Sequence, residues 1–136
     1  MQLQPYLFFD GRCEEAIDFY RDKLGAEVTM MVRFKDAPEP QAAMTPPGGE
    51  NKVMHARFRV GDAAVLASDG RCQGNPQFQG FSLSLTASSS DEAEKMFAAL
   101  GDGGVVQMPL TQTFFSPRFG MVADRFGVSW MVYVAP

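Results

Sequence analysis

The chain has 136 residues, which suits one domain of ordinary size and is too short for two. Hydrophobic residues make up 46% and charged residues 21%, as in soluble globular proteins, and no apolar run approaches the ~20 residues that span a bilayer. The net charge of −4, without a basic stripe, argues against nucleic acid as a partner. The N-terminal segment lacks the basic and small-residue features of a secretion signal. We therefore expect a cytoplasmic protein with no membrane partner.

An internal duplication organises the chain. Residues 7–28 contain an apolar run, a turn, an acidic helix start and an amphipathic stretch closed by glycine, and residues 83–106 repeat this order. Three positions match at a constant offset of 77: Glu15 and Ala16 recur as Glu92 and Ala93, and the aromatic Tyr20 is matched by Phe97. The pattern predicts one domain, residues 1–136, made of two modules of about 1–70 and 80–136 with a linker at 71–79.

The first module is predicted to contain a strand, a helix and three further strands. The helix starts at Cys13, keeps its apolar residues at i, i+3, i+4 and i+7, and can end at Gly25. The expected strands are Leu3–Phe9, Glu27–Phe34, Val53–Val60 and Ala63–Ser68. The Pro- and Gly-rich residues 35–52 predict a long loop, and Gly61-Asp62 a two-residue hairpin turn.

The second module is predicted to repeat this order. Ser89 and Glu92 have the spacing of a capping box at a helix start, and the following apolar stripe consists of Ala93, Met96, Phe97 and Leu100. The expected strands are Phe81–Thr86, Val105–Thr113, Arg118–Ala123 and Val128–Val134. In the first of them Ser82 and Ser84 alternate with leucine. If the helix covers the apolar side, these hydroxyls face a cavity together with Met131; otherwise they face water.

Several other side chains are candidates for a ligand site. His55, the single histidine, is either a ligand-orienting donor or an ordinary strand histidine held by a hydrogen bond. Phe114 and Met121 belong to a cluster of aromatic and thioether side chains that could line a pocket or fill a core. Arg118 could anchor a ligand carboxylate or join subunits of a dimer. Cys13 lies in the apolar stripe of the first helix, which predicts a buried structural thiol.

The tandem βαβββ order resembles the glyoxalase, bleomycin-resistance and extradiol-dioxygenase superfamily, also called vicinal oxygen chelate. The segments that carry the likeness are PYLFFDGRCEEAIDFY near the start and TFF…RFGMVADRFGVSWM near the end, and the second is similar to the PhnB-like branch, also labelled 3-demethylubiquinone 3-methyltransferase-like. The resemblance covers essentially the whole chain. It implies an α+β fold, two βαβββ modules whose mixed sheets curve around a cleft, and a homodimer.

The resemblance also implies where a metal site would be. Metal-dependent members take His and Glu ligands from the first and fourth strands of each module, positions that fall here near Pro5, Ala67, Ser82 and Met131. None of these residues is a strong metal ligand, so we predict no metal. No glycine-rich turn of the kind that holds a methyl donor opens either helix, so we also predict no cofactor.

The sequence therefore predicts a metal-free protein that binds a small aromatic or amphipathic molecule, with no catalytic residue assigned. The predicted ligand-binding residues are His55, Ser82, Ser84, Phe114, Arg118, Met121 and Met131. One alternative is a metal-dependent enzyme of the glyoxalase or dioxygenase type with an atypical site that includes Asp69 and His55. The other is a structural or interaction role for the dimer.

Overall fold

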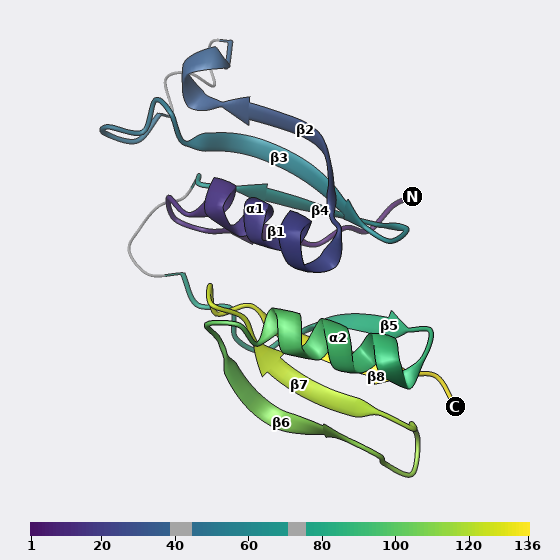
Figure 1. The fold of residues 1–136 in the computed structure, drawn as a ribbon. Coiled ribbons are helices and arrows are strands. Elements are labelled where there is room, and N and C mark those ends of the chain that lie inside the picture. Colours follow the sequence, from purple (N-terminus) through teal and green to yellow (C-terminus); the bar gives the residue numbers. More distant parts are fainter. Residues whose placement is uncertain (39–44, 71–75) are drawn as a thin grey trace. The chain divides into compact units, whose positions relative to one another are not determined.

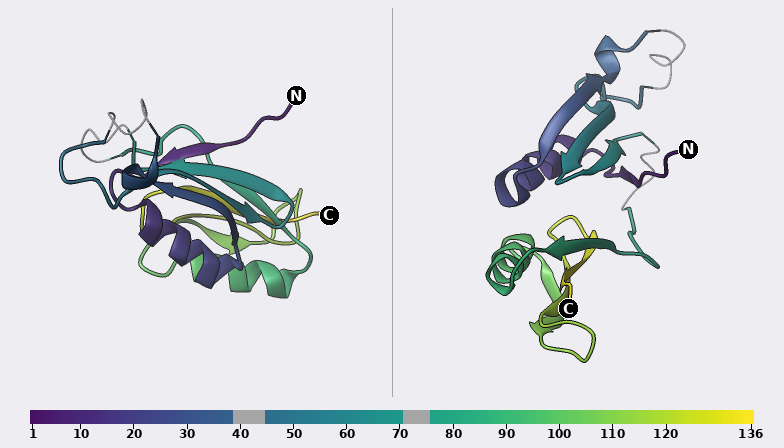
Figure 2. Two further views of the ribbon diagram at one scale, coloured as in Figure 1. Left: turned by 90° about the horizontal axis from the view of Figure 1, so that it is seen from above. Right: turned by 90° about the vertical axis from the view of Figure 1, so that its right-hand side faces the viewer.

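The computed structural model describes residues 1–38, 45–70 and 76–136, and it divides into two compact units, Met1–Pro76 and Gln77–Pro136 (Figure 1). Each unit contains a four-stranded sheet with one long helix along one face, as Figure 2 shows from two further directions. Residues 71–75 of the predicted linker, Cys72 included, lie outside the described residues. Within the described part of the chain, neither helix has the length and apolar character needed to cross a membrane.

The N-terminal unit follows the predicted order of elements. They are β1 (Tyr6–Phe8), α1 (Cys13–Leu24), β2 (Glu27–Arg33), the short 3-10 helix η1 (Phe34–Asp36), β3 (Val53–Val60) and β4 (Ala63–Ser68). In the sheet the strands lie in the order β1-β4-β3-β2, with β1 parallel to β4 and the other pairs antiparallel. The predicted turn at Gly61-Asp62 closes the β3–β4 hairpin.

The C-terminal unit repeats this topology. Its elements are β5 (Leu83–Ala87), α2 (Ser90–Leu100), β6 (Val105–Thr111), β7 (Phe119–Ala123) and β8 (Ser129–Val134). The strand order β5-β8-β7-β6, with β5 parallel to β8, matches the first sheet strand for strand. The predicted α+β class and the duplicated βαβββ order are therefore confirmed.

Several strand boundaries differ from the predictions by one to three residues, among them the start of β5, which lies at Leu83 and not at Phe81, and two in the N-terminal unit have a visible cause. Strand β1 is shorter than expected, because its ladder with β4 begins at Tyr6, and Leu3 is 98% exposed. Strand β2 ends at Arg33 because the chain turns into η1 and buries Phe34, which is 3% exposed. Apolar sequence alone did not predict either end, since both depend on where a neighbouring segment stops.

Each helix covers the apolar face of its sheet. In the N-terminal unit Tyr20 of α1 stacks on Phe58 with ring centroids 5.7 Å apart. In the C-terminal unit α2 packs on β5, β7 and β8, and it covers Trp130 and Val132 as predicted. A Cβ atom at Gly120 would lie 2.7 Å from the Phe97 ring, so glycine is what lets the helix approach there. The side chains of β5 and β8 that alternate with these buried residues therefore lie on the opposite face of the sheet.

The Cys13 thiol is fully buried at the start of α1, and burial, followed by the nearby Asp69 carboxylate, raises its pKa. The folded protein therefore keeps a proton that the unfolded chain releases above about pH 8.5. Stability is then complete below about pH 8.5 and falls as the pH rises past that value, by about 1.4 kcal/mol per unit. We expect this fall between about pH 8.5 and 9.5 in urea unfolding of a Cys72→Ser protein.

The control for this prediction is the same protein with Cys13→Ala added, which should show no such fall. A thiol reagent should also leave Cys13 unmodified in the folded Cys72→Ser protein and modify it in urea, because thiolate and access are both missing in the native state. Rapid native labelling at Cys13 would contradict the burial on which the prediction depends.

Candidate functional site

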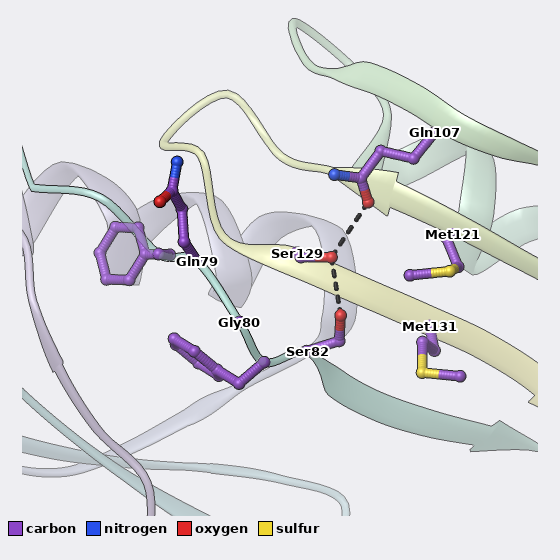
Figure 3. Close-up of a pocket in the computed structure, with 9 residues that line it drawn as sticks. Gln79, Gly80, Ser82, Gln107, Met121, Ser129 and Met131 are labelled. Carbon is purple, nitrogen blue, oxygen red and sulfur yellow. Dashed lines mark hydrogen bonds between the residues drawn. The ribbon is translucent and has the colours of Figure 1, made fainter.

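A pocket of about 560 Å³ lies in the C-terminal unit, on the face of the sheet that carries Met121 and Met131 (Figure 3). It is bordered by the segment that leads into β5 and by strands β6, β7 and β8. Its lining consists of Phe78, Gln79, Gly80, Phe81, Ser82, Gln107, Met121, Ser129 and Met131. None of these side chains is ionisable, so the pocket combines apolar surface with neutral hydrogen-bonding groups.

Two methionines form the apolar wall. Met121 of β7 and Met131 of β8 are directly opposite each other in the antiparallel ladder, and Figure 3 shows their thioethers side by side. Phe81, at the entrance to β5, is 46% exposed. Thioethers are polarizable, adapt to irregular shapes and make favourable contacts with aromatic rings. This wall is suited to a flat apolar or aromatic group.

A chain of three polar side chains runs across the pocket (Figure 3). The Ser82 and Ser129 hydroxyl oxygens are 2.8 Å apart, and the Ser129 hydroxyl donates to Oε1 of Gln107 at 3.0 Å. Since Ser129 has only one hydroxyl hydrogen, Ser82 is the donor in the first bond. The three residues come from the β5 entrance, β8 and β6, so the chain links three separate segments.

Gln107 reaches this chain because of an irregularity in β6. The ladder pairs Val106 with Val122 and then Met108 with Met121, which leaves Gln107 as an extra residue between the two pairs. Such a bulge bends the strand and re-aims a side chain. Here the extra residue brings the Gln107 amide to Ser129, two residues before Met131 on the same face of β8.

The structure brings three of the predicted site residues together in the pocket, namely Ser82, Met121 and Met131. Ser84 lies on the same face, opposite Met131 in the β5–β8 register, but does not line the pocket. Phe114 is fully exposed outside the lining, and Arg118 pairs with Glu94 of α2 at 3.0 Å. For these three residues a ligand role stays a prediction.

His55 belongs to the other unit and has its own partner there. The Tyr6 hydroxyl lies 2.9 Å from Nδ1 of His55, and the two rings are 5.6 Å apart. Burial is the main cause of a raised pKa at Tyr6, which keeps the phenol protonated. This contact fits a strand histidine held by a hydrogen bond. A ligand role for His55 likewise stays a prediction.

The residues present do not fit the metal site of the superfamily. Ala67 is fully buried, and its neighbours in the register belong to the face that α1 covers. Asp69, part of the alternative site, accepts three backbone N–H groups through its two oxygens. Among residues 1–38, 45–70 and 76–136, no three His, Cys, Asp or Glu side chains gather as metal ligands would. We derive no metal-dependent step.

A second cavity, of about 340 Å³, lies in the N-terminal unit and is lined mainly by charged groups. Glu14 and Arg33 form an ion pair there, whose hydrogen bond lowers the pKa of Glu14, and Lys52 donates to the Gly11 carbonyl oxygen. These charged groups already bond to one another or to the backbone, so this cavity has fewer hydrogen-bonding groups left for a ligand than the neutral pocket has.

Sequence reasoning missed two of the three residues in the polar chain. Ser129 could have been found, because it precedes Met131 by two residues and so shares its face of a strand. Gln107 could not, because the bulge that places it depends on the register between β6 and β7.

Comparison with known proteins agrees with this fold. A family model described as 3-demethylubiquinone-9 3-methyltransferase matches residues 1–133. Protein YjdN of Escherichia coli is 34% identical, over 98% of this chain and 95% of its own length. The crystal structure of protein PA1353 from Pseudomonas aeruginosa is 44% identical and has a TM-score of 0.87, covering 99% of this chain and 98% of that one.

Two further structures place the family among related folds. A Bacillus cereus protein described as a putative 3-demethylubiquinone-9 3-methyltransferase, PhnB protein, is 30% identical with a TM-score of 0.82, covering 99% of this chain and all of that one. A glyoxylase, bleomycin resistance protein and dioxygenase domain from Frankia shares the fold at 12% identity, with a TM-score of 0.71 over 100% of this chain and 98% of that one. The chain thus belongs to the 3-demethylubiquinone-9 3-methyltransferase family, is similar to a PhnB protein of that description, and has the fold of the glyoxylase, bleomycin resistance protein and dioxygenase domain.

Proposed function

We propose that this protein binds a small, partly aromatic molecule without a metal ion, in the pocket of its C-terminal unit. The observation that carries the proposal is the combination of a methionine wall with a hydroxyl–amide chain around one cavity of about 560 Å³. Cavities of roughly 300–1,000 Å³ with an apolar lining and a few placed polar groups are typical of small-molecule sites. The described residues supply binding groups, and none of them forms a nucleophile–base pair in the pocket.

The methyltransferase activity named in the family's description finds no support in these residues. A methyl donor bound in the manner of a nucleotide needs a parallel strand, a glycine-rich turn and a helix start in sequence. Here β1 leads into α1 through Asp10, Gly11 and Arg12, and only β1 and β4 of that sheet are parallel. Binding without chemical change is the simpler assignment for the pocket.

A second candidate function is assembly through the edge of the C-terminal sheet. Strand β6 is an edge strand and exposes three apolar side chains, Val105, Val106 and Met108, by 66%, 51% and 42%. Exposed apolar edges tend to pair with another chain. This supports the predicted homodimer as a further proposal, which the native mass of the protein would test.

The ligand proposal predicts a response confined to the pocket methionines. With methyl-labelled methionine, a neutral naphthyl compound should shift the NMR signals of Met121 and Met131 and leave Met96 of α2 unchanged. A chelator should have no effect on the titration. Met131→Glu should weaken binding at least about tenfold, because it places a carboxylate against the apolar wall.

The control for this variant is Gln112→Glu, which adds the same charge on an exposed loop outside the lining. It should leave the titration unchanged. If the naphthyl compound moves no pocket methionine, or binds only after a divalent metal is added, the proposed function is wrong.

A further inference from the structure

The hydrogen bonds in the pocket have a direction, and we infer from it which class of molecule the pocket selects. The ligand is uncharged and carries an acceptor oxygen, as a ketone does, and this oxygen takes a hydrogen bond from the side-chain amide N–H of Gln107. The inference rests on the proposed function, since it specifies the ligand of the same pocket.

The direction of the chain follows from counting hydrogens. Ser129 uses its hydroxyl hydrogen on Oε1 of Gln107, at 3.0 Å, so Ser82 must donate to Ser129. Both hydroxyl hydrogens are therefore committed inside the protein. Because Oε1 of Gln107 is the acceptor, the amide nitrogen Nε2 is held in a fixed orientation, and its two N–H groups have no acceptor within the described residues.

At Gln107 this arrangement leaves the pocket with donors to offer, whereas the Gln79 amide elsewhere in the lining supplies both a donor and an acceptor. The Gln107 amide presents two N–H groups, whereas its oxygen is already bonded to Ser129. Gln107 is exposed, so water can bond to its amide in the free protein, and a ligand oxygen that reaches the amide takes the place of that water. A ligand with a donor at this place, such as an ammonium group, meets donors instead.

The pocket lining carries no charge, which favours a neutral ligand over an ion. All nine lining residues are neutral, so a carboxylate on the ligand could accept from Gln107 but would find no cation among them. Transferring an ion from water to such a surface is unfavourable unless it is paired. A neutral oxygen keeps the hydrogen bond and avoids this cost.

The apolar wall determines the shape of the remaining part of the ligand, which we expect to be a flat ring. Figure 3 shows the Met121 and Met131 thioethers on the same side of the strands as the Gln107 amide. A flat ring that lies on the methionines with its oxygen substituent directed to the amide would make both contacts. Sulfur–aromatic contacts favour this pose.

The test is a matched series on one ring system. The probes are 2-acetylnaphthalene, which is neutral with an acceptor oxygen, 2-naphthoate, which is an anion, and 1-(2-naphthyl)ethylamine, which is a cation at neutral pH. We expect the ketone to bind about tenfold more tightly than either ion, measured by the Met121 and Met131 methyl shifts. With about 13 non-hydrogen atoms, its Kd should be on the order of 1 mM.

Variants of Gln107 separate the inference from the proposed function. Gln107→Leu removes the donor and should lose the tenfold preference for the ketone while the methionine shifts persist. Gln107→Glu replaces the donor by a charged acceptor and should reverse the preference toward the amine. The matched controls, Gln112→Leu and Gln112→Glu, lie on an exposed loop outside the lining and should change neither value.

The outcomes are distinct. If the three probes bind equally, or if Gln107→Leu keeps the full ketone preference, the inference is overturned and the proposed function stands. If no probe moves either pocket methionine at millimolar concentration, both are overturned. Ketone preference in the wild type, its loss in Gln107→Leu and its reversal in Gln107→Glu together would establish the ligand class.

Discussion

Replacing Asp124 by alanine should lower the free energy of unfolding by about 3–5 kcal/mol, in line with removal of a buried charged acceptor. The Asp124 side chain is 3% exposed in the turn between β7 and β8. Its Oδ1 accepts the backbone N–H groups of Phe126 and Val128 at 2.9 and 3.1 Å, and its Oδ2 accepts Nε1–H of Trp130 at 2.9 Å. Alanine would leave all three donors buried without their partner.

The measurement is urea unfolding followed by circular dichroism. Trp130→Phe removes one donor and should cost about 1–2 kcal/mol, and a double-mutant cycle with Asp124→Ala should give a coupling of at least about 0.5 kcal/mol. Asp91→Ala, at the exposed start of α2, is the matched control and should cost no more than about 1 kcal/mol. A loss at Asp124 no larger than this control would show that the three bonds are not formed.

This turn explains in physical terms the motif that carried the family resemblance. In the sequence ADRFGVSWM, Asp124 accepts hydrogen bonds from the backbone of the turn, and Gly127 takes the left-handed conformation with φ of 89°. The indole N–H of Trp130 donates to the carboxylate of Asp124. The motif therefore fixes the register of β7 and β8, which holds Met121 opposite Met131. Asp124, Gly127 and Trp130 thus contribute to the pocket through strand pairing, whereas Ser129 and Met131 of the same motif line it directly.

The fold was predictable because its signals are local and occur twice. The Ser89 hydroxyl accepts the Glu92 N–H at 3.1 Å, as the capping-box spacing predicts, and Gly25 ends α1 with φ of 67°. The alternation of serine and leucine in β5 predicted that Ser84 and Met131 share a face, and the register places these two residues opposite each other. Each of these features needs only a few consecutive residues.

The site was predictable only in part, because a site depends on which strands become neighbours. Ser82 and Met131 could be placed on one face from strand parity, and Met121 was found as part of a cluster of aromatic and thioether side chains. Gln107 depends on a bulge and Phe78 on the path of the chain before β5, neither of which has a local sequence signal. Phe114 and Arg118 follow β6 in a loop, where apolar composition says little about direction.

Asp69→Ala should be about as destabilising as Asp124→Ala, by about 3–5 kcal/mol, for the same reason in the other unit. Its carboxylate, 1% exposed, accepts the N–H groups of Gly11 and Cys13 at 2.7 and 2.9 Å through Oδ1 and that of Val53 at 3.0 Å through Oδ2. No side chain of α1 caps its first turn, so Asp69 supplies that cap from the end of β4. One carboxylate thus joins β4 to the starts of α1 and β3.

The conservative variant Asp69→Asn separates this structural role from metal binding. Asparagine keeps an oxygen for Gly11 and Cys13 but turns an NH₂ group toward the Val53 N–H, so it should cost less than alanine, about 1–3 kcal/mol, with amide exchange accelerated at Val53 before Gly11. Asp62→Ala, in the exposed β3–β4 turn, is the control and should change stability little. If Asp69 were a metal ligand, zinc would stabilise the wild type and not the asparagine variant. Because both carboxylate oxygens already hold backbone N–H groups, we expect zinc to stabilise neither.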